Sequence, residues 1–204
     1  MIFATIPAGV LYAIPVAVIF TVAWLLQYFS QKIVKSASEN VTSTTADAAL
    51  KEFLNANGLN DVSVVPSADY TYNDYNVETG SIELSLDVIG CVDVNSVVLA
   101  LRAGGRALAF HNHPERAAHL KRLQRVGTVV FWIAFCVLSI GIMSSSLAGS
   151  VAGYGVAVLV GLINLCEKSV QKKFDAQVES FVDATSLFDS QTKDAVKKTL
   201  AATR

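Results

Sequence analysis

The chain has 204 residues, a formal net charge of −1 and 52% hydrophobic residues, with a mean hydropathy of +0.46. The near-neutral charge gives no reason to expect a nucleic-acid partner, and the apolar fraction is higher than that of a typical soluble domain. The three cysteines, Cys91, Cys136 and Cys166, show no CxxC spacing and no paired framework, so we expect no structural disulfide.

Three apolar runs divide the chain, at Ile2–Phe29, Val126–Met143 and Leu147–Leu165. About 20 apolar residues cross the hydrocarbon core of a bilayer, so we predict three transmembrane helices, the last two forming a hairpin. Basic residues flank the runs on one side only: Lys32 and Lys35, then Arg116, Lys121, Arg122 and Arg125, then Lys168, Lys172 and Lys173. The positive-inside rule then places the N-terminus outside. The main domain and the C-terminus face the cytoplasm, or the matrix or stroma of an organelle.

The residues between the runs are predicted to form a mixed helix and strand domain. Apolar residues at helical spacing predict helices, and short β-branched runs predict strands. The helices are Ala46–Asn57, Ser96–Phe110 and Asp189–Ala202; the strands are Asp61–Val65 and Ser81–Leu84; Asn73–Asn76 has turn character. We therefore expect four parts: an N-terminal span at 1–30, the inner domain at 31–125, a hairpin at 126–166, and a helical tail at 167–204 that packs with the inner domain.

The helix at Ser96–Phe110 contains the most informative segment, Arg102-Ala103-Gly104-Gly105-Arg106. Its setting resembles the HExxH helix of the YugP-like neutral zinc metallopeptidases, a family of membrane proteases whose helix reads roughly A-x-H-E-x-G-H-A-[IL]-Q-H. The frame is matched by Ala100, Gly105, Ala107 and Leu108. In this alignment Arg102 and Arg106 fall on the two histidines, and Ala103 falls on the glutamate.

Weaker phrases extend the resemblance over residues 15–180, in the family's order. They are Asn57–Val62, Asn73–Val77, Glu83–Ser85 and Lys172–Gln177. The resemblance implies an α+β membrane protein in which a small zincin-like domain accompanies the three transmembrane helices. It also places Lys173 where the family carries an acidic residue.

The resemblance further implies that the catalytic chemistry is absent. Two histidines at i and i+4 bind zinc through neutral imidazoles, and the adjacent glutamate takes a proton from the metal-bound water. Arginine stays protonated and offers no lone pair, and Ala103 has no basic group. We therefore expect no catalytic residue, no metal and no cofactor in this helix.

The replacing cations leave three alternatives open. Arg102, Arg106 and Lys173 could face water, could pair with internal acids such as Asp74 or Glu83, or could together bind an anion such as a phosphate or a lipid head group.

A metal site formed by His111, His113 and His119, with Glu115 as the base, is a further alternative. It requires an extended segment, because residues at i and i+2 of a helix point about 200° apart.

These residues support three hypotheses on function. The first is a catalytically inactive metallopeptidase-like protein that serves as an accessory or scaffolding subunit of a larger membrane complex, such as a respiratory or photosynthetic one. The second is a regulatory pseudoprotease that binds substrates or an active protease. The third is an active zinc protease with the non-standard histidine site. We favour the first, with the lipid bilayer and other membrane protein subunits as partners and no nucleic acid.

Overall fold

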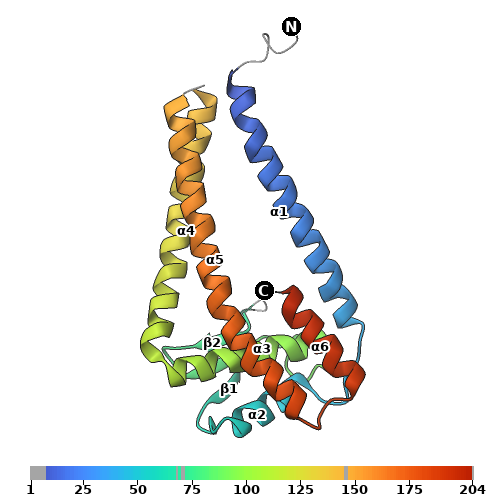
Figure 1. The fold of residues 1–204 in the computed structure, drawn as a ribbon. Coiled ribbons are helices and arrows are strands. Elements are labelled where there is room, and N and C mark those ends of the chain that lie inside the picture. Colours follow the sequence, from blue (N-terminus) through green and yellow to red (C-terminus); the bar gives the residue numbers. More distant parts are fainter. Residues whose placement is uncertain (1–7, 68, 70–71, 145–146, 204) are drawn as a thin grey trace. The chain divides into compact units, whose positions relative to one another are not determined.

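The computed structural model describes residues 8–67, 69, 72–144 and 147–203 (Figure 1). The chain forms two compact units, Met1–Phe29 with Ala118–Ser169, and Ser30–Ala117 with Val170–Arg204. We call these the first and the second unit. The two arginines of the central helix belong to the second unit.

The second unit contains a small sheet and most of the shorter helices. After the end of α1 (Ala8–Ser38) come α2 (Ala46–Ala56), β1 (Ser63–Pro66), β2 (Asp74–Asn76), β3 (Ser81–Leu84) and α3 (Val94–Asn112). The end of α5 (Leu147–Ala184) and α6 (Ser190–Ala202) complete it. The predicted helices at Ala46–Asn57, Ser96–Phe110 and Asp189–Ala202 are confirmed, with small shifts at their ends.

Side-chain caps fix where three of these helices begin. Thr45, Asp93 and Asp189 each have extended backbone and accept a hydrogen bond from the amide of the residue three positions on. Such a cap satisfies one of the amides that a helix start leaves without an intrahelical partner. The starts of α2, α3 and α6 are therefore encoded locally.

The three strands form one sheet in the order β1-β3-β2. β1 pairs with β3 in parallel and β2 pairs with β3 antiparallel, with Asp74 opposite Glu83. The predicted strands at Asp61–Val65 and Ser81–Leu84 are confirmed, the first with its ends shifted. The predicted turn at Asn73–Asn76 is wrong for most of its length, because the second edge of β3 draws Asp74–Asn76 into the sheet. Asn73 supports this pairing by accepting a hydrogen bond from the Ser85 amide at 2.8 Å.

The described hydrophobic core lies in the second unit, around α3. Burying one such aliphatic or aromatic side chain contributes about 1.5–3 kcal/mol, so this cluster is the main source of the unit's stability. It includes Leu50, Phe53 and Leu54 of α2, Ile82 and Leu84 of β3, Val97, Val98 and Leu101 of α3, Val178 and Val182 of α5, and Val196 and Leu200 of α6.

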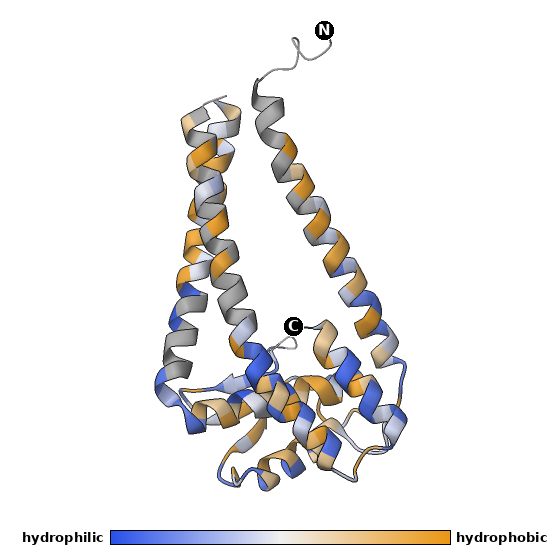
Figure 2. Ribbon diagram, in the orientation of Figure 1, coloured by the Kyte–Doolittle hydropathy of each residue, from blue (hydrophilic) through white to orange (hydrophobic). Residues whose placement is uncertain are grey.

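The described part of the first unit is helical: it comprises α1 up to Phe29, nearly all of α4 (Pro114–Met143), and α5 up to Ser169. The three apolar runs do not stand as separate helices. The described part of each run belongs to a longer helix that also carries charged residues, as Figure 2 shows for α4, whose charged positions gather in its first turns. Large apolar side chains such as Trp24, Leu26 and Trp132 are exposed in this unit.

The prediction of three transmembrane helices is wrong on this structure. Crossing a bilayer takes about 20 consecutive apolar residues. Among the residues that the structure describes, no helix offers a stretch that is long enough and apolar enough for this. The same finding contradicts the predicted localisation, an integral three-span membrane protein with its N-terminus outside and its main domain and C-terminus inside. The fold class that the described residues show is therefore α+β with a small sheet.

Candidate functional site

Helix α3 places Arg102 and Arg106 one turn apart, and close helix packing surrounds them. A Cβ added to Gly104 would lie 2.7 Å from Leu50 Cδ1 of α2, and one added to Gly105 would lie 2.9 Å from Val178 Cγ2 of α5. The absence of side chains at these two positions thus lets α2 and α5 approach α3. Residues at i and i+4 share a helix face, so both arginines start from the same side of α3.

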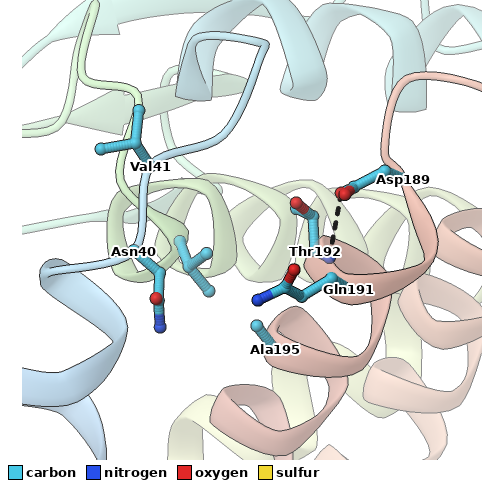
Figure 3. Close-up of a pocket in the computed structure, with 7 residues that line it drawn as sticks. Asn40, Val41, Asp189, Gln191, Thr192 and Ala195 are labelled. Atoms are coloured by element: carbon cyan, nitrogen blue, oxygen red, sulfur yellow. Dashed lines mark hydrogen bonds between the residues drawn. The ribbon is translucent and has the colours of Figure 1, made fainter.

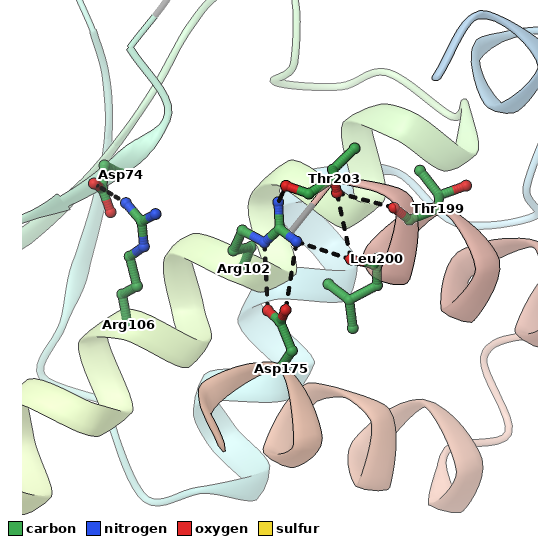
Figure 4. Close-up of polar contacts among 7 residues, drawn as sticks. All are labelled: Asp74, Arg102, Arg106, Asp175, Thr199, Leu200 and Thr203. Carbon is green, nitrogen blue, oxygen red and sulfur yellow. Dashed lines mark hydrogen bonds and ion pairs between the residues drawn. The ribbon is translucent and has the colours of Figure 1, made fainter. Parts of the chain in front are cut away.

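Arg102 connects α3 to two other helices. Its Nε and Nη2 donate to the two carboxylate oxygens of Asp175 on α5, at 3.4 and 3.5 Å. Its Nη2 also donates to the carbonyl of Leu200 at 3.0 Å, and its Nη1 to the carbonyl of Thr203 at 3.1 Å (Figure 4). We call these four residues the Arg102 cluster. The side chain of Arg102 is 12% exposed and that of Asp175 only 1%, so the pair is largely removed from water.

Arg106 points away from the Arg102 cluster, toward the sheet. Its Nη1 pairs with Asp74 at the start of β2, one of the two acids that the sequence suggested as partners (Figure 4). Glu83, which lies opposite Asp74 in the sheet, accepts instead from the side-chain amide of Asn76 at 2.7 Å. Partial burial raises the pKa of Tyr72 above its ordinary value, and the negative charges of Asp74 and Glu83 act in the same direction. This end of the sheet is therefore an acidic patch that Arg106 partly neutralises.

The structure does not gather the other predicted site residues around these arginines. Ala103 is buried in the core, with 1% of its surface exposed. Lys173 is exposed on α5, two residues before Asp175. Arg102, Arg106 and Lys173 are thus not brought together. The two guanidinium groups turn toward separate carboxylates, which is the internal pairing left open as one of the three alternatives.

The chain matches, over residues 9–203, the family described as putative neutral zinc metallopeptidases. It belongs to this family. The family named from the sequence is thereby confirmed, and the match extends through α6. No curated protein and no solved structure matches the chain.

The zinc that the family name implies does not fit the residues that this metallopeptidase-family chain presents on α3. Arg102 and Arg106, which the resemblance places at the family's two histidines, carry guanidinium groups, and these are fixed cations without a lone pair. The nearest carboxylates, Asp175 and Asp74, are already engaged with them. Among the described residues, no group of three histidine, cysteine or acidic side chains is placed to hold a metal ion.

The alternative histidine site is not assembled in the described residues. His111 lies in the last turn of α3, and His113 is the residue that caps the end of this helix. Both side chains are exposed, as is that of Glu115 in the first turn of α4. The side chain of His119 lies outside what the structure describes. Since α3 continues to Asn112, the extended backbone that this site requires is not present up to that residue.

Sequence reasoning missed Asp175, the main partner of Arg102. A signal was present in the spacing, because Asp175 shares a helix face with the apolar residues Val178 and Val182 on α5. An acidic residue on an otherwise apolar helix face is costly to bury without a partner. Its position therefore indicated a buried cation, although not which one.

A small polar cavity lies at the other end of α3. It has a volume of about 180 Å³ and is lined by Asn40, Val41, Val94, Asp189, Gln191, Thr192 and Ala195 (Figure 3). Asp189 is occupied in capping α6, accepting from the Thr192 amide at 3.0 Å. Val94 on α3 and Ala195 on α6 face the same cavity, which shows that the two helices begin side by side.

Proposed function

We propose that this chain is a non-catalytic member of the zinc metallopeptidase family that acts as an accessory subunit, by binding other proteins. The observation that carries the proposal is the internal pairing of both replacing cations. Arg102 is bonded to Asp175 and to two carbonyls, and Arg106 is bonded to Asp74.

The chemistry of hydrolysis supports the first half of this proposal. A zinc peptidase needs neutral nitrogen or carboxylate ligands for the metal and a base beside the activated water. On α3 these positions hold two permanent cations and the methyl group of Ala103. Two guanidinium groups also repel a dication, so the helix disfavours metal binding rather than merely lacking ligands.

The retained core supports the second half. The scaffold around α3 keeps a continuous apolar core although the catalytic residue types are gone. Its surface carries apolar side chains on neighbouring segments: Val41 is 72% exposed and Val92 is 38% exposed, and the Thr42 amide donates to the carbonyl of Val92. A folded domain without the catalytic groups still offers surfaces, and binding is the activity that such surfaces can perform.

A peptidase assay tests the loss of catalysis. The purified full chain is incubated with a mixture of unstructured peptides, with added zinc or with a chelator, beside an active family member prepared in the same way. We expect no cleavage above background and no stoichiometric zinc by elemental mass spectrometry. Cleavage that the chelator abolishes would overturn the proposal. The variants His111→Ala and His113→Ala would then show whether the histidines form the site.

A second experiment tests the accessory role. The tagged chain is expressed at its native level in its own cells, purified gently, sized, and analysed by cross-linking mass spectrometry. We expect an assembly of constant stoichiometry that is also recovered when a tag is placed on the partner. If the purified chain migrates alone, at its own mass of 21.8 kDa, the accessory role is refuted. Co-purification of peptides or of an active peptidase in variable amounts also contradicts it, in favour of a substrate-binding pseudoprotease.

A further inference from the structure

Helix α6 runs along α3 in the same direction. At one end Ala195 and Thr192 share a cavity with Val94 at the start of α3. At the other end the carbonyls of Leu200 and Thr203 are bonded to Arg102, further along α3. The two helices are therefore in contact over the first half of α3 and the whole length of α6.

The described apolar attachment of α6 is small. Of its 13 residues only Val196, Thr199 and Leu200 are buried. Beyond the Arg102 cluster, α6 is held by Lys193, which donates to the carbonyl of Asp183 at 2.8 Å, and by an ion pair between Lys197 and the Asp183 carboxylate. Elements with few buried contacts open at lower free energy than the core does. Each polar contact of α6 therefore contributes noticeably to keeping this helix packed against α3.

The C-terminal end of α6 is satisfied by side chains from elsewhere in the fold. The last carbonyls of a helix have no intrahelical partner, and they carry the negative end of the helix dipole. Here Arg102 donates to the carbonyls of Leu200 and Thr203, and Ser30 donates to the carbonyl of Ala202 at 2.9 Å. The guanidinium group thus supplies both hydrogen bonds and the favourable sign of charge.

We infer that Arg102 is the anchor of a helical strap, α6, and that its guanidinium group joins α3, α5 and α6 without any metal, at the position aligned with the family's first zinc ligand. A planar fork with several N–H donors can bond Asp175 on one side and two carbonyls on the other, which a lysine ammonium cannot reproduce with the same geometry. When this anchor is lost, α6 opens from α3 more often, at a lower free energy than the rest of the core. This inference concerns only how α6 is held against α3, and it does not depend on the accessory role.

Hydrogen exchange of the full chain, followed by mass spectrometry, tests the anchor. The variant Arg102→Gln removes the charge and the fork, and Arg106→Gln is the matched control because it removes the same group one turn away. We expect the amides of Lys197–Thr203 to exchange about tenfold faster or more in Arg102→Gln, since losing one bond to a charged group corresponds to about that factor. In the same variant the amides of α2 should lose less protection than those of α6, since α6 opens without unfolding the core.

The controls make each outcome decisive. In Arg106→Gln the exchange of α6 should match that of the wild type, and a chelator should leave α6 unchanged in the wild type. Unchanged α6 exchange in Arg102→Gln, or faster α6 exchange on chelation, overturns the inference. If Arg102→Gln fails to fold, Arg102→Lys is measured instead: faster exchange confined to α6 supports the anchor, and wild-type exchange refutes it.

Discussion

Helices α2 and α3 approach closely at Gly104, and the substitution Gly104→Ala probes this contact. The added Cβ would lie 2.7 Å from Leu50 Cδ1 and 2.9 and 3.2 Å from Phe53 Cδ1 and Cε1. Carbon atoms attract best at about 3.5–4.0 Å, so at least one neighbour must move. Both side chains are fully buried, and the ring of Phe53 is also held edge-on against Phe181, with 5.1 Å between the ring centroids.

Two opposing terms set the size of the effect. Overpacking a filled core costs about 1–3 kcal/mol. Replacing glycine by alanine inside a helix stabilises the helix by about 0.8–1 kcal/mol. Because two groups on α2 are in the way and one of them is held, we expect Gly104→Ala to lower the free energy of unfolding by about 1–2 kcal/mol.

Urea denaturation followed by circular dichroism measures this change, with two other glycines as controls. At Gly105 the added Cβ meets one group below 3.4 Å, the Cγ2 of Val178 at 2.9 Å, so we expect a smaller loss of stability than at Gly104. At Gly155 nothing lies within 4 Å, so Gly155→Ala should stabilise its helix by about 0.8–1 kcal/mol. If Gly104→Ala proves as stable as the wild type while Gly155→Ala gains stability, the close approach of α2 to α3 is refuted.

Three further predictions concern charged groups. Arg102→Met leaves the buried carboxylate of Asp175 without its cation and should lower the free energy of unfolding by about 3–5 kcal/mol. The double variant Arg102→Met with Asp175→Leu should recover most of this loss. Equal losses in the single and double variants would contradict the pairing. Arg106→Met breaks a pair whose two side chains are 29% and 27% exposed, so chemical denaturation should show a loss of about 1 kcal/mol or less that shrinks further in high salt. Although burial acts against it, hydrogen bonds from the Thr45 side chain and the Gly90 amide lower the pKa of Asp47. Its folded-state pKa lies below the unfolded value, so its contribution is present above the ordinary carboxyl pKa of about 4 and is lost as the pH falls through the folded pKa. The urea midpoint of Asp47→Asn should therefore fall less than that of the wild type over this acidic window, and parallel curves would exclude the effect.

Several features of this protein could be predicted from the sequence because they depend on local chemistry. Helices α2, α3 and α6 begin at capping residues and carry apolar residues at helical spacing, so their places are encoded within a few residues. The family relationship follows from short phrases in a fixed order, and the match over residues 9–203 confirms it. That the two key positions of α3 hold arginine is likewise a fact of the sequence, with a chemical meaning that needs no structure.

Apolar runs were a less reliable guide. Their length predicted three membrane spans, whereas the described residues contain no helix that qualifies as one. The runs are continuous in the sequence with charged residues of the same helices, and composition alone does not show where a helix ends. The prediction of a turn at Asn73–Asn76 was wrong for a related reason. It rested on the turn-forming residue types, whereas Asp74–Asn76 form a strand because they pair with the open edge of β3.

The roles of the two arginines were decided only by tertiary structure. Spacing places Arg102 and Arg106 on one face of α3, which left a shared site and separate ion pairs both open. In the folded chain each arginine instead pairs with its own carboxylate. Arg102 binds Asp175, which is 73 residues away in the sequence, and Arg106 binds Asp74, which is 32 residues away. The carbonyls of Leu200 and Thr203 are more distant still in the sequence, and no local pattern shows which cation will reach them. The sequence determined which charges are present, and the packing of α5, α6 and the sheet around α3 determined which charges meet, because the energy of an ion pair depends on distance in space and not along the chain.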